Sequence, residues 1–153
     1  MTVAPLLVIG VGNPSRGDDA LGPLFLDRVA AALGGDLAAG RIELLTDFQL
    51  QIEHALDLKG RRRVVFVDAS VAAEAPFSWE RVVARRDESA TTHAMSPAAV
   101  LATYHAVVGD PPEAYVLGIR GERFELGEGL SASAEAHLDA AVRFFVDRAA
   151  HED

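Results

Sequence analysis

The chain alternates short apolar runs with longer stretches in which apolar residues recur every three or four positions. The first run, residues 6–11, is continuously apolar and leads into a loop of Gly, Asn, Pro and Ser, a pattern typical of a buried strand that ends in a turn. From residue 21 to residue 33 the apolar positions follow helical spacing, and Gly34 and Gly35 are expected to end that helix. The chain therefore begins with a strand, a loop and a helix.

The rest of the chain repeats this order. Buried strands are predicted over residues 41–46, 64–68 and 114–119, an edge or antiparallel strand over 77–86, and helices over 49–58, 97–108 and 132–149. The expected N-caps of these helices are Asp47, Ser96 and Ser131. We predict one α/β domain over residues 1–153, a three-layer α/β/α sandwich around a mostly parallel sheet of about five strands with one antiparallel edge strand.

Acidic residues follow two of the predicted strands. Asp18 and Asp19 come after the first loop, and Asp68 follows the apolar run of the third strand. Ligands of open α/β sheets bind at the carboxyl ends of the strands, so Asp19 and Asp68 are expected to approach one point, where they could bind a cation. The alternative is that Asp18 and Asp19 only complement the positive end of the following helix.

A third ligand would have to be a histidine or another acid, because the chain contains no cysteine. His93 lies in a Thr-Thr-His loop, whereas the other four histidines lie on predicted helices or in the C-terminal tail. Two carboxylates and an imidazole suit a borderline divalent ion such as zinc or nickel, with coordination positions left open. Spacing and composition alone leave this ligand set undecided.

Composition and motifs argue against several classes of function. A net charge of −9 disfavours a sequence-independent grip on nucleic acid, and the first apolar run is too short to span a membrane, so a cytoplasmic protein is expected. The Gly10-Val11-Gly12 turn lacks the third glycine of a dinucleotide site, and Asp18-Asp19 replaces the Lys-Ser/Thr pair of a phosphate-binding loop. Without a cysteine or a Gly-x-Ser-x-Gly elbow, a covalent catalytic triad has little support.

Several motifs together resemble the nickel-iron hydrogenase maturation endopeptidases, in order and over most of the chain. They are Gly10-Val11-Gly12-Asn13, Gly17-Asp18-Asp19-Ala20-Leu21-Gly22-Pro23, Val67-Asp68-Ala69, Thr92-His93, Leu117-Gly118-Ile119 and Gly129-Leu130-Ser131.

The resemblance implies an aspartyl-type endopeptidase that removes the C-terminal extension of a hydrogenase large-subunit precursor after nickel insertion. It implies that Asp19, Asp68 and His93 are the catalytic and metal-binding residues. The nickel would come with the substrate, and zinc or cadmium would replace it in crystals.

One segment departs from the family pattern. Where the family often has Asp-Gly-Gly-Ser/Thr after the second strand, this chain has Asp47-Phe48-Gln49-Leu50-Gln51. The difference suggests a hydrogenase partner of another subclass, such as the soluble NAD-coupled type. Two other functions remain open: a non-catalytic nickel-dependent checkpoint or delivery module that binds the precursor, and a small-molecule hydrolase on a similar scaffold.

Overall fold

The structure, a computed structural model, describes residues 2–87 and 95–151 and is built on a five-stranded sheet. The strand order is β2-β1-β3-β5-β4. The parallel strands are β1 (Leu6–Val11), β2 (Ile42–Asp47), β3 (Arg63–Ser70) and β5 (Glu113–Arg120). Strand β4 (Phe77–Val82) pairs antiparallel with β5 at the edge. The predicted sheet is confirmed, although the edge strand expected over residues 77–86 ends at Val82.

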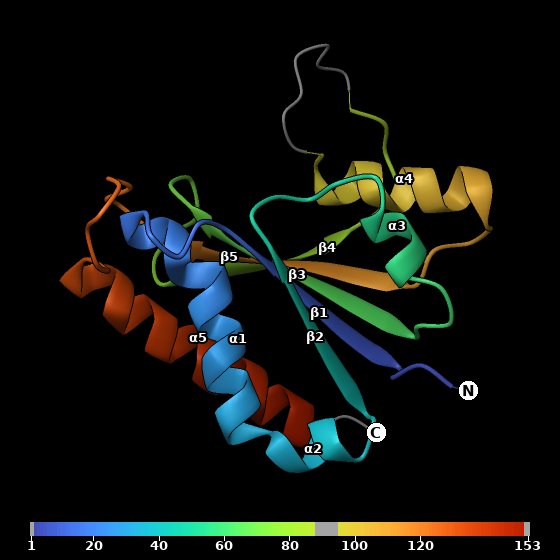
Figure 1. Ribbon diagram of the computed structural model, residues 1–153, viewed down its shortest axis with the longest axis horizontal. Coiled ribbons are helices and arrows are strands. Elements are labelled where there is room, and N and C mark those ends of the chain that lie inside the picture. The colour runs from blue at the N-terminus through green and yellow to red at the C-terminus, as the bar shows by residue number, and fades with distance from the viewer. Residues whose placement is uncertain (1, 88–94, 152–153) are drawn as a thin grey trace.

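Helices cover both faces of this sheet (Figure 1). One face carries α1 (Leu21–Ala32) and α5 (Ala132–His151), and the other carries α3 (His54–Asp57) and α4 (Pro97–Val107). A 3₁₀ turn, η1 (Gly17–Ala20), leads into α1, and α2 (Gly34–Ala38) follows it. The three-layer arrangement is therefore confirmed. Across the described ranges, every helix is too short or too polar to cross a membrane.

The central strand β3 is apolar on both faces, as expected for a strand covered by helices on either side. Val65 and Val67 pack in the core under α1 and α5, whereas Val64 and Phe66 pack in the core under α3 and α4. Because side chains alternate along a strand, the next residue, Asp68, projects on the side of α3 and α4. The sequence predicts that this residue ends the strand, but β3 continues to Ser70 because pairing with β5 persists that far.

Helix α1 begins very close to the sheet because Gly22 has no side chain. A Cβ atom at Gly22 would lie 2.3 Å from the carbonyl oxygen of Val11 and 3.0 Å from that of Val67. Both atoms belong to backbone and cannot rotate away. The first turn of α1 can therefore rest directly on the ends of β1 and β3.

Replacing Gly22 with alanine is expected to lower the free energy of unfolding by roughly 1–3 kcal/mol, the usual cost of overpacking. Gly35→Ala is the matched control, because a Cβ at Gly35 meets nothing within 4 Å. Denaturant unfolding followed by circular dichroism would compare the two. Equal stabilities would contradict the close helix–sheet contact.

The segment after β2 differs from the prediction. Instead of capping a helix over 49–58, Asp47 extends β2, paired with Val11, and its Oδ1 accepts a hydrogen bond from the N–H of Phe48 at 2.7 Å. Leu50 is then buried in the core under α3 and α4, and its carbonyl accepts a hydrogen bond from Met95. Only the last turn of the predicted helix forms, as α3.

The other predicted helix starts are confirmed. The Oγ of Ser96 accepts a hydrogen bond from the N–H of Ala99 at 3.1 Å, and the Oγ of Ser131 accepts one from Ala134 at 3.2 Å. These are N-cap contacts, in which a side chain satisfies an N–H group of the first turn. Gly34 and Gly35 do not act only as a stop, since α1 ends at Ala32 and α2 begins at Gly34.

Candidate active site

The candidate site lies where neighbouring strands β1 and β3 send the chain in opposite directions. From β1 the chain passes through α1 to β2 on one side of the sheet order, and from β3 it continues to β4 and β5 on the other. Such a reversal leaves a crevice at the carboxyl ends of the two strands. Asp19 follows β1 and Asp68 lies near the end of β3, so the topology brings both to this crevice.

Both carboxylates line a cavity of about 460 Å³ on the α3 and α4 side of the sheet. The rest of the lining is apolar in one part and formed by small residues in another. Its main apolar walls come from Ile9, Val11, Leu50, Phe66, Met95 and Val116, and its small residues are Ser70, Ser78 and Gly118. The structure thus gathers two of the three residues expected to bind metal around one space.

Asp19 is held by the loop that follows β1. Its Oδ2 accepts a hydrogen bond from the N–H of Asn13 at 2.8 Å. The turn passes so close to Asp19 that a Cβ at Gly12 would lie 1.9 Å from its carbonyl oxygen, and Gly12 has a φ of 143°. Only glycine fits this combination of conformation and contact. Gly12 and Asn13 therefore fix the backbone and the carboxylate of Asp19 together.

The carboxyl group of Asp68 has an unusual environment. Its surface is open to the cavity, but the surrounding walls displace much of the bulk water. This desolvation is the main cause that raises the pKa of Asp68 to about 7, with the charge of Asp19 acting in the same direction and the N–H of Ala69 opposing both. The carboxyl group is thus about half protonated near neutral pH.

The Asp68 carboxyl group should titrate near pH 7 in a carbon-detected NMR experiment on the metal-free protein. Asp19→Asn should lower that pKa by removing a nearby negative charge, whereas Asp27→Asn, at an exposed position on α1, should leave it unchanged. Between about pH 4 and 7 the folded state binds more protons than the unfolded state, so the contribution of Asp68 to stability falls as the pH rises. A midpoint near 4 would contradict the desolvated environment.

Asp18, adjacent in sequence, has a different role. It is fully buried, and its carboxylate accepts hydrogen bonds from the N–H groups of Glu122, Arg123 and Ser131 and from the Oγ of Ser131, at 2.7–3.0 Å. Burial alone would raise the pKa of Asp18, but these four hydrogen bonds outweigh it and lower the pKa. Asp18 therefore anchors the loop over residues 121–131 to η1 and is not among the residues that line the cavity.

The third expected ligand, His93, lies outside the described residues. Within residues 2–87 and 95–151, no three histidine or acidic side chains are grouped closely enough to hold a metal ion. Two of the other histidines have structural contacts: the Nδ1 of His54 accepts a hydrogen bond from Gln51 at 2.8 Å, and the Nδ1 of His137 lies 2.9 Å from the carbonyl oxygen of Arg120. Both lie on helices, where the sequence placed them.

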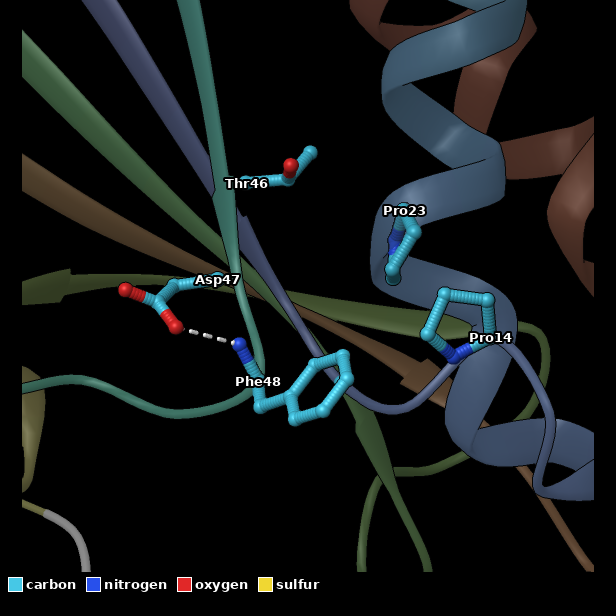
Figure 2. A pocket seen from close by; sticks show the side chains of 6 residues that line it. Pro14, Pro23, Thr46, Asp47 and Phe48 are labelled. Atoms are coloured by element: carbon cyan, nitrogen blue, oxygen red, sulfur yellow. Dashed lines mark hydrogen bonds between the residues drawn. The ribbon is translucent and has the colours of Figure 1, made fainter.

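A second pocket, of about 330 Å³, adjoins the first on the α1 side of the sheet (Figure 2). Pro14, Pro23, Thr46 and Asp47 line it together with Phe48. The Phe48 side chain is 69% exposed and also lines the larger cavity. A large apolar side chain thus stands in solvent between two pockets at the carboxyl end of the sheet.

The sequence analysis gave no site role to Ser70, Ser78 or Gly118, which lie on the cavity surface. The signal for Gly118 was present, because a glycine inside an apolar strand weakens it and often marks a close approach or a space for a ligand. No comparable signal marks the two serines, since hydroxyl groups are common on edge strands and in turns.

The fold matches solved structures over nearly the whole chain. A [NiFe] hydrogenase maturation protease, HycI, from Thermococcus kodakarensis has a TM-score of 0.72 and 19% identity, covering 94% of this chain and 91% of its own. The hydrogenase maturating endopeptidase HybD from Escherichia coli has a TM-score of 0.66 and 25% identity, covering 97% and 91%. The chain has the fold of the hydrogenase maturation proteases.

The resemblance inferred from the motifs is therefore confirmed at the level of this protease fold. A further endopeptidase from Escherichia coli, solved in solution, covers 100% of this chain and 96% of its own at 24% identity and a TM-score of 0.65. No protein-family model matches the sequence, and no curated protein matches it either.

Proposed function

We propose that the protein is an endopeptidase that removes the C-terminal extension of a nickel-iron hydrogenase large-subunit precursor after nickel insertion. The observation that carries the proposal is the pairing of Asp19 and Asp68 in one cavity at the crevice between β1 and β3. It is supported by a fold shared with hydrogenase maturation proteases over more than nine-tenths of both chains. The nickel is part of the substrate and serves as the recognition element.

The residues present fit such an ion. Asp19 and Asp68 offer carboxylate oxygens, and His93 would supply an imidazole, a donor set suited to nickel or zinc. Met95 lines the cavity only two positions after His93, which supports His93 as the third ligand. A loaded precursor would complete the coordination, so that only a precursor carrying nickel is held with its scissile bond in the cavity.

Asp68 is also the candidate general base. Its pKa of about 7 applies to the metal-free carboxyl group; beside the ion the same group would stay ionised and able to accept a proton. In its ionised form it would take a proton from the attacking water, whose oxygen bonds to the scissile carbonyl carbon. It would then give that proton to the departing amine as the C–N bond breaks. The nickel would supply Lewis acidity for the carbonyl oxygen.

The segment Phe48–Leu50 supports a partner of a particular subclass. Its exposed phenyl ring stands where the family often has small residues, at the mouth of the cavity. We propose that the partner is the precursor of a soluble NAD-coupled hydrogenase, which would present a matching surface to Phe48.

The proposal is tested by incubating the protein with purified, nickel-loaded precursors of several hydrogenase subclasses and measuring their masses. One precursor should lose its C-terminal extension, whereas the same precursor without nickel should stay intact. A stable complex without shortening would instead support a checkpoint or delivery module. Turnover of a small ester or amide with no cleavage of any precursor would support a small-molecule hydrolase.

A further inference from the structure

The cavity continues past the two carboxylates across the floor of the sheet. Asp68 of β3 is the register partner of Gly118 of β5, which in turn is the partner of Ser78 of β4. These three residues form one row, and all line the cavity. Gly118 has no side chain, so the floor between the Asp68 carboxyl group and the Ser78 hydroxyl group is backbone, and a Cβ at Gly118 would already lie 2.9 Å from the Ser78 Oγ.

The space over this row is larger than a metal site requires. A water molecule occupies about 30 Å³, so an ion with a few waters takes on the order of 100 Å³. The cavity measures about 460 Å³, within the range of about 300–1,000 Å³ typical of pockets that hold organic ligands. Most of its volume is therefore available to another group.

The lining of that extra space indicates which group it would accept. Asp19 and Asp68 are the only charged side chains among the described lining residues, and both lie at the metal end. The remaining wall combines apolar residues, including Phe66 and Val116, with uncharged polar side chains, which are those of Gln49, Ser70, Ser78 and Ser96. An acidic group would be repelled by the two carboxylates, and a basic group would compete with the metal for them. An uncharged, mainly apolar group fits.

We propose that this space, the Gly118 pocket, lined by Phe66, Val116, Gly118 and Ser78, binds an apolar side chain of the substrate, on one of the two residues joined by the scissile bond. The inference rests on the proposed endopeptidase function and adds a specificity determinant to it. The occupant must adjoin the scissile bond because the pocket is continuous with the carboxylates that would act on that bond. Gly118 and Ser78 then set the size of the side chain that is accepted.

The test first fills the pocket by substitutions in the protein and then makes the substrate side chain smaller. Ser78→Leu adds bulk from the edge strand, and Gly118→Ala adds a methyl group that would lie 2.9 Å from the Ser78 Oγ, a contact that rotation of the hydroxyl relieves. The control is Glu80→Leu, on the same face of β4 but outside the cavity lining. Each variant is assayed on the cognate precursor, whose cleaved bond is located by mass spectrometry, and on precursors with alanine at either flanking residue.

Ser78→Leu is expected to lower kcat/KM on the natural precursor about tenfold or more, the usual effect of a few misfitting methyl groups in an apolar pocket. One of the two alanine precursors should restore the rate of Ser78→Leu to within about threefold of the wild-type protein on that same precursor. Gly118→Ala should show the same pattern more weakly. Nickel affinity, measured by calorimetry, and Glu80→Leu activity should be unchanged.

Equal activity of Ser78→Leu and wild type on the natural precursor would overturn the inference while leaving the proposed function intact. A loss of activity that neither alanine precursor restores would also overturn it, because it would show a general defect. If the wild-type protein cleaves no precursor, the proposed function itself fails, and the inference fails with it. The assay of the wild-type protein thus distinguishes failure of the proposed function from failure of this inference alone.

Discussion

Asp68→Asn is expected to lower the rate of precursor cleavage by about a thousandfold, within the range of roughly 10²–10⁴ for loss of a general base. The amide keeps the size of the side chain but can neither accept the proton of the attacking water nor bind nickel as an anion. His93→Ala, which removes the third expected ligand, should abolish processing with the fold intact. Mass spectrometry of the precursor measures both effects.

The control for these variants is Asp27→Asn, which changes an exposed carboxylate on α1 and should process the precursor at the wild-type rate. Circular dichroism and thermal unfolding would show that all the variants are folded. Normal cleavage by Asp68→Asn or by His93→Ala would remove the basis of the proposed mechanism.

Asp18→Ala is expected to lower the free energy of unfolding by roughly 3–5 kcal/mol, because four donors lose their acceptor and each unsatisfied donor costs about 1–3 kcal/mol. The substitution leaves three backbone N–H groups and the Ser131 hydroxyl group, all in partly buried hydrogen bonds, without their acceptor. The loop over residues 121–131 would lose its anchor to η1. Urea unfolding at neutral pH measures the effect, and Asp27→Ala should differ from wild type by less than about 0.5 kcal/mol.

The same carboxylate makes stability depend on acid. Because the pKa of Asp18 is lowered in the folded protein, its contribution to stability is complete above its ordinary value and is lost as the pH falls through the folded value. The wild-type protein should therefore lose more stability on acidification than Asp18→Ala does. An equal acid sensitivity of the two proteins would show that the hydrogen bonds to Asp18 contribute little.

Sequence patterns predicted most of the fold because apolar residues are spaced differently in strands and in helices. The alternation of apolar runs and helical spacing gave the strands, their mostly parallel order and the edge strand β4, and Ser96 and Ser131 marked two helix starts. Of the helix expected over residues 49–58, only the last turn forms. Tertiary contacts determine the conformation of residues 49–53, since Leu50 is buried in the core and its carbonyl accepts a hydrogen bond from Met95.

The site was only partly accessible to the same reasoning. Asp19 and Asp68 were found because acidic residues directly after apolar strands converge at one edge of a parallel sheet. The different roles of Asp18 and Asp19 were not predicted, because they depend on a loop more than a hundred residues later in the chain. The Gly118 pocket was not predicted either, because it comes from three strands in register.

The bonds of Asp18 to the 121–131 loop also set an order for biosynthesis. The segments that carry Asp19 and Asp68 are translated within the first half of the 153 residues, but the last partner of Asp18 is Ser131. Domains acquire structure from the N-terminus as they leave the ribosome. The crevice is consequently finished only after Ser131 has been made, so a chain truncated before that residue lacks a completed cleft.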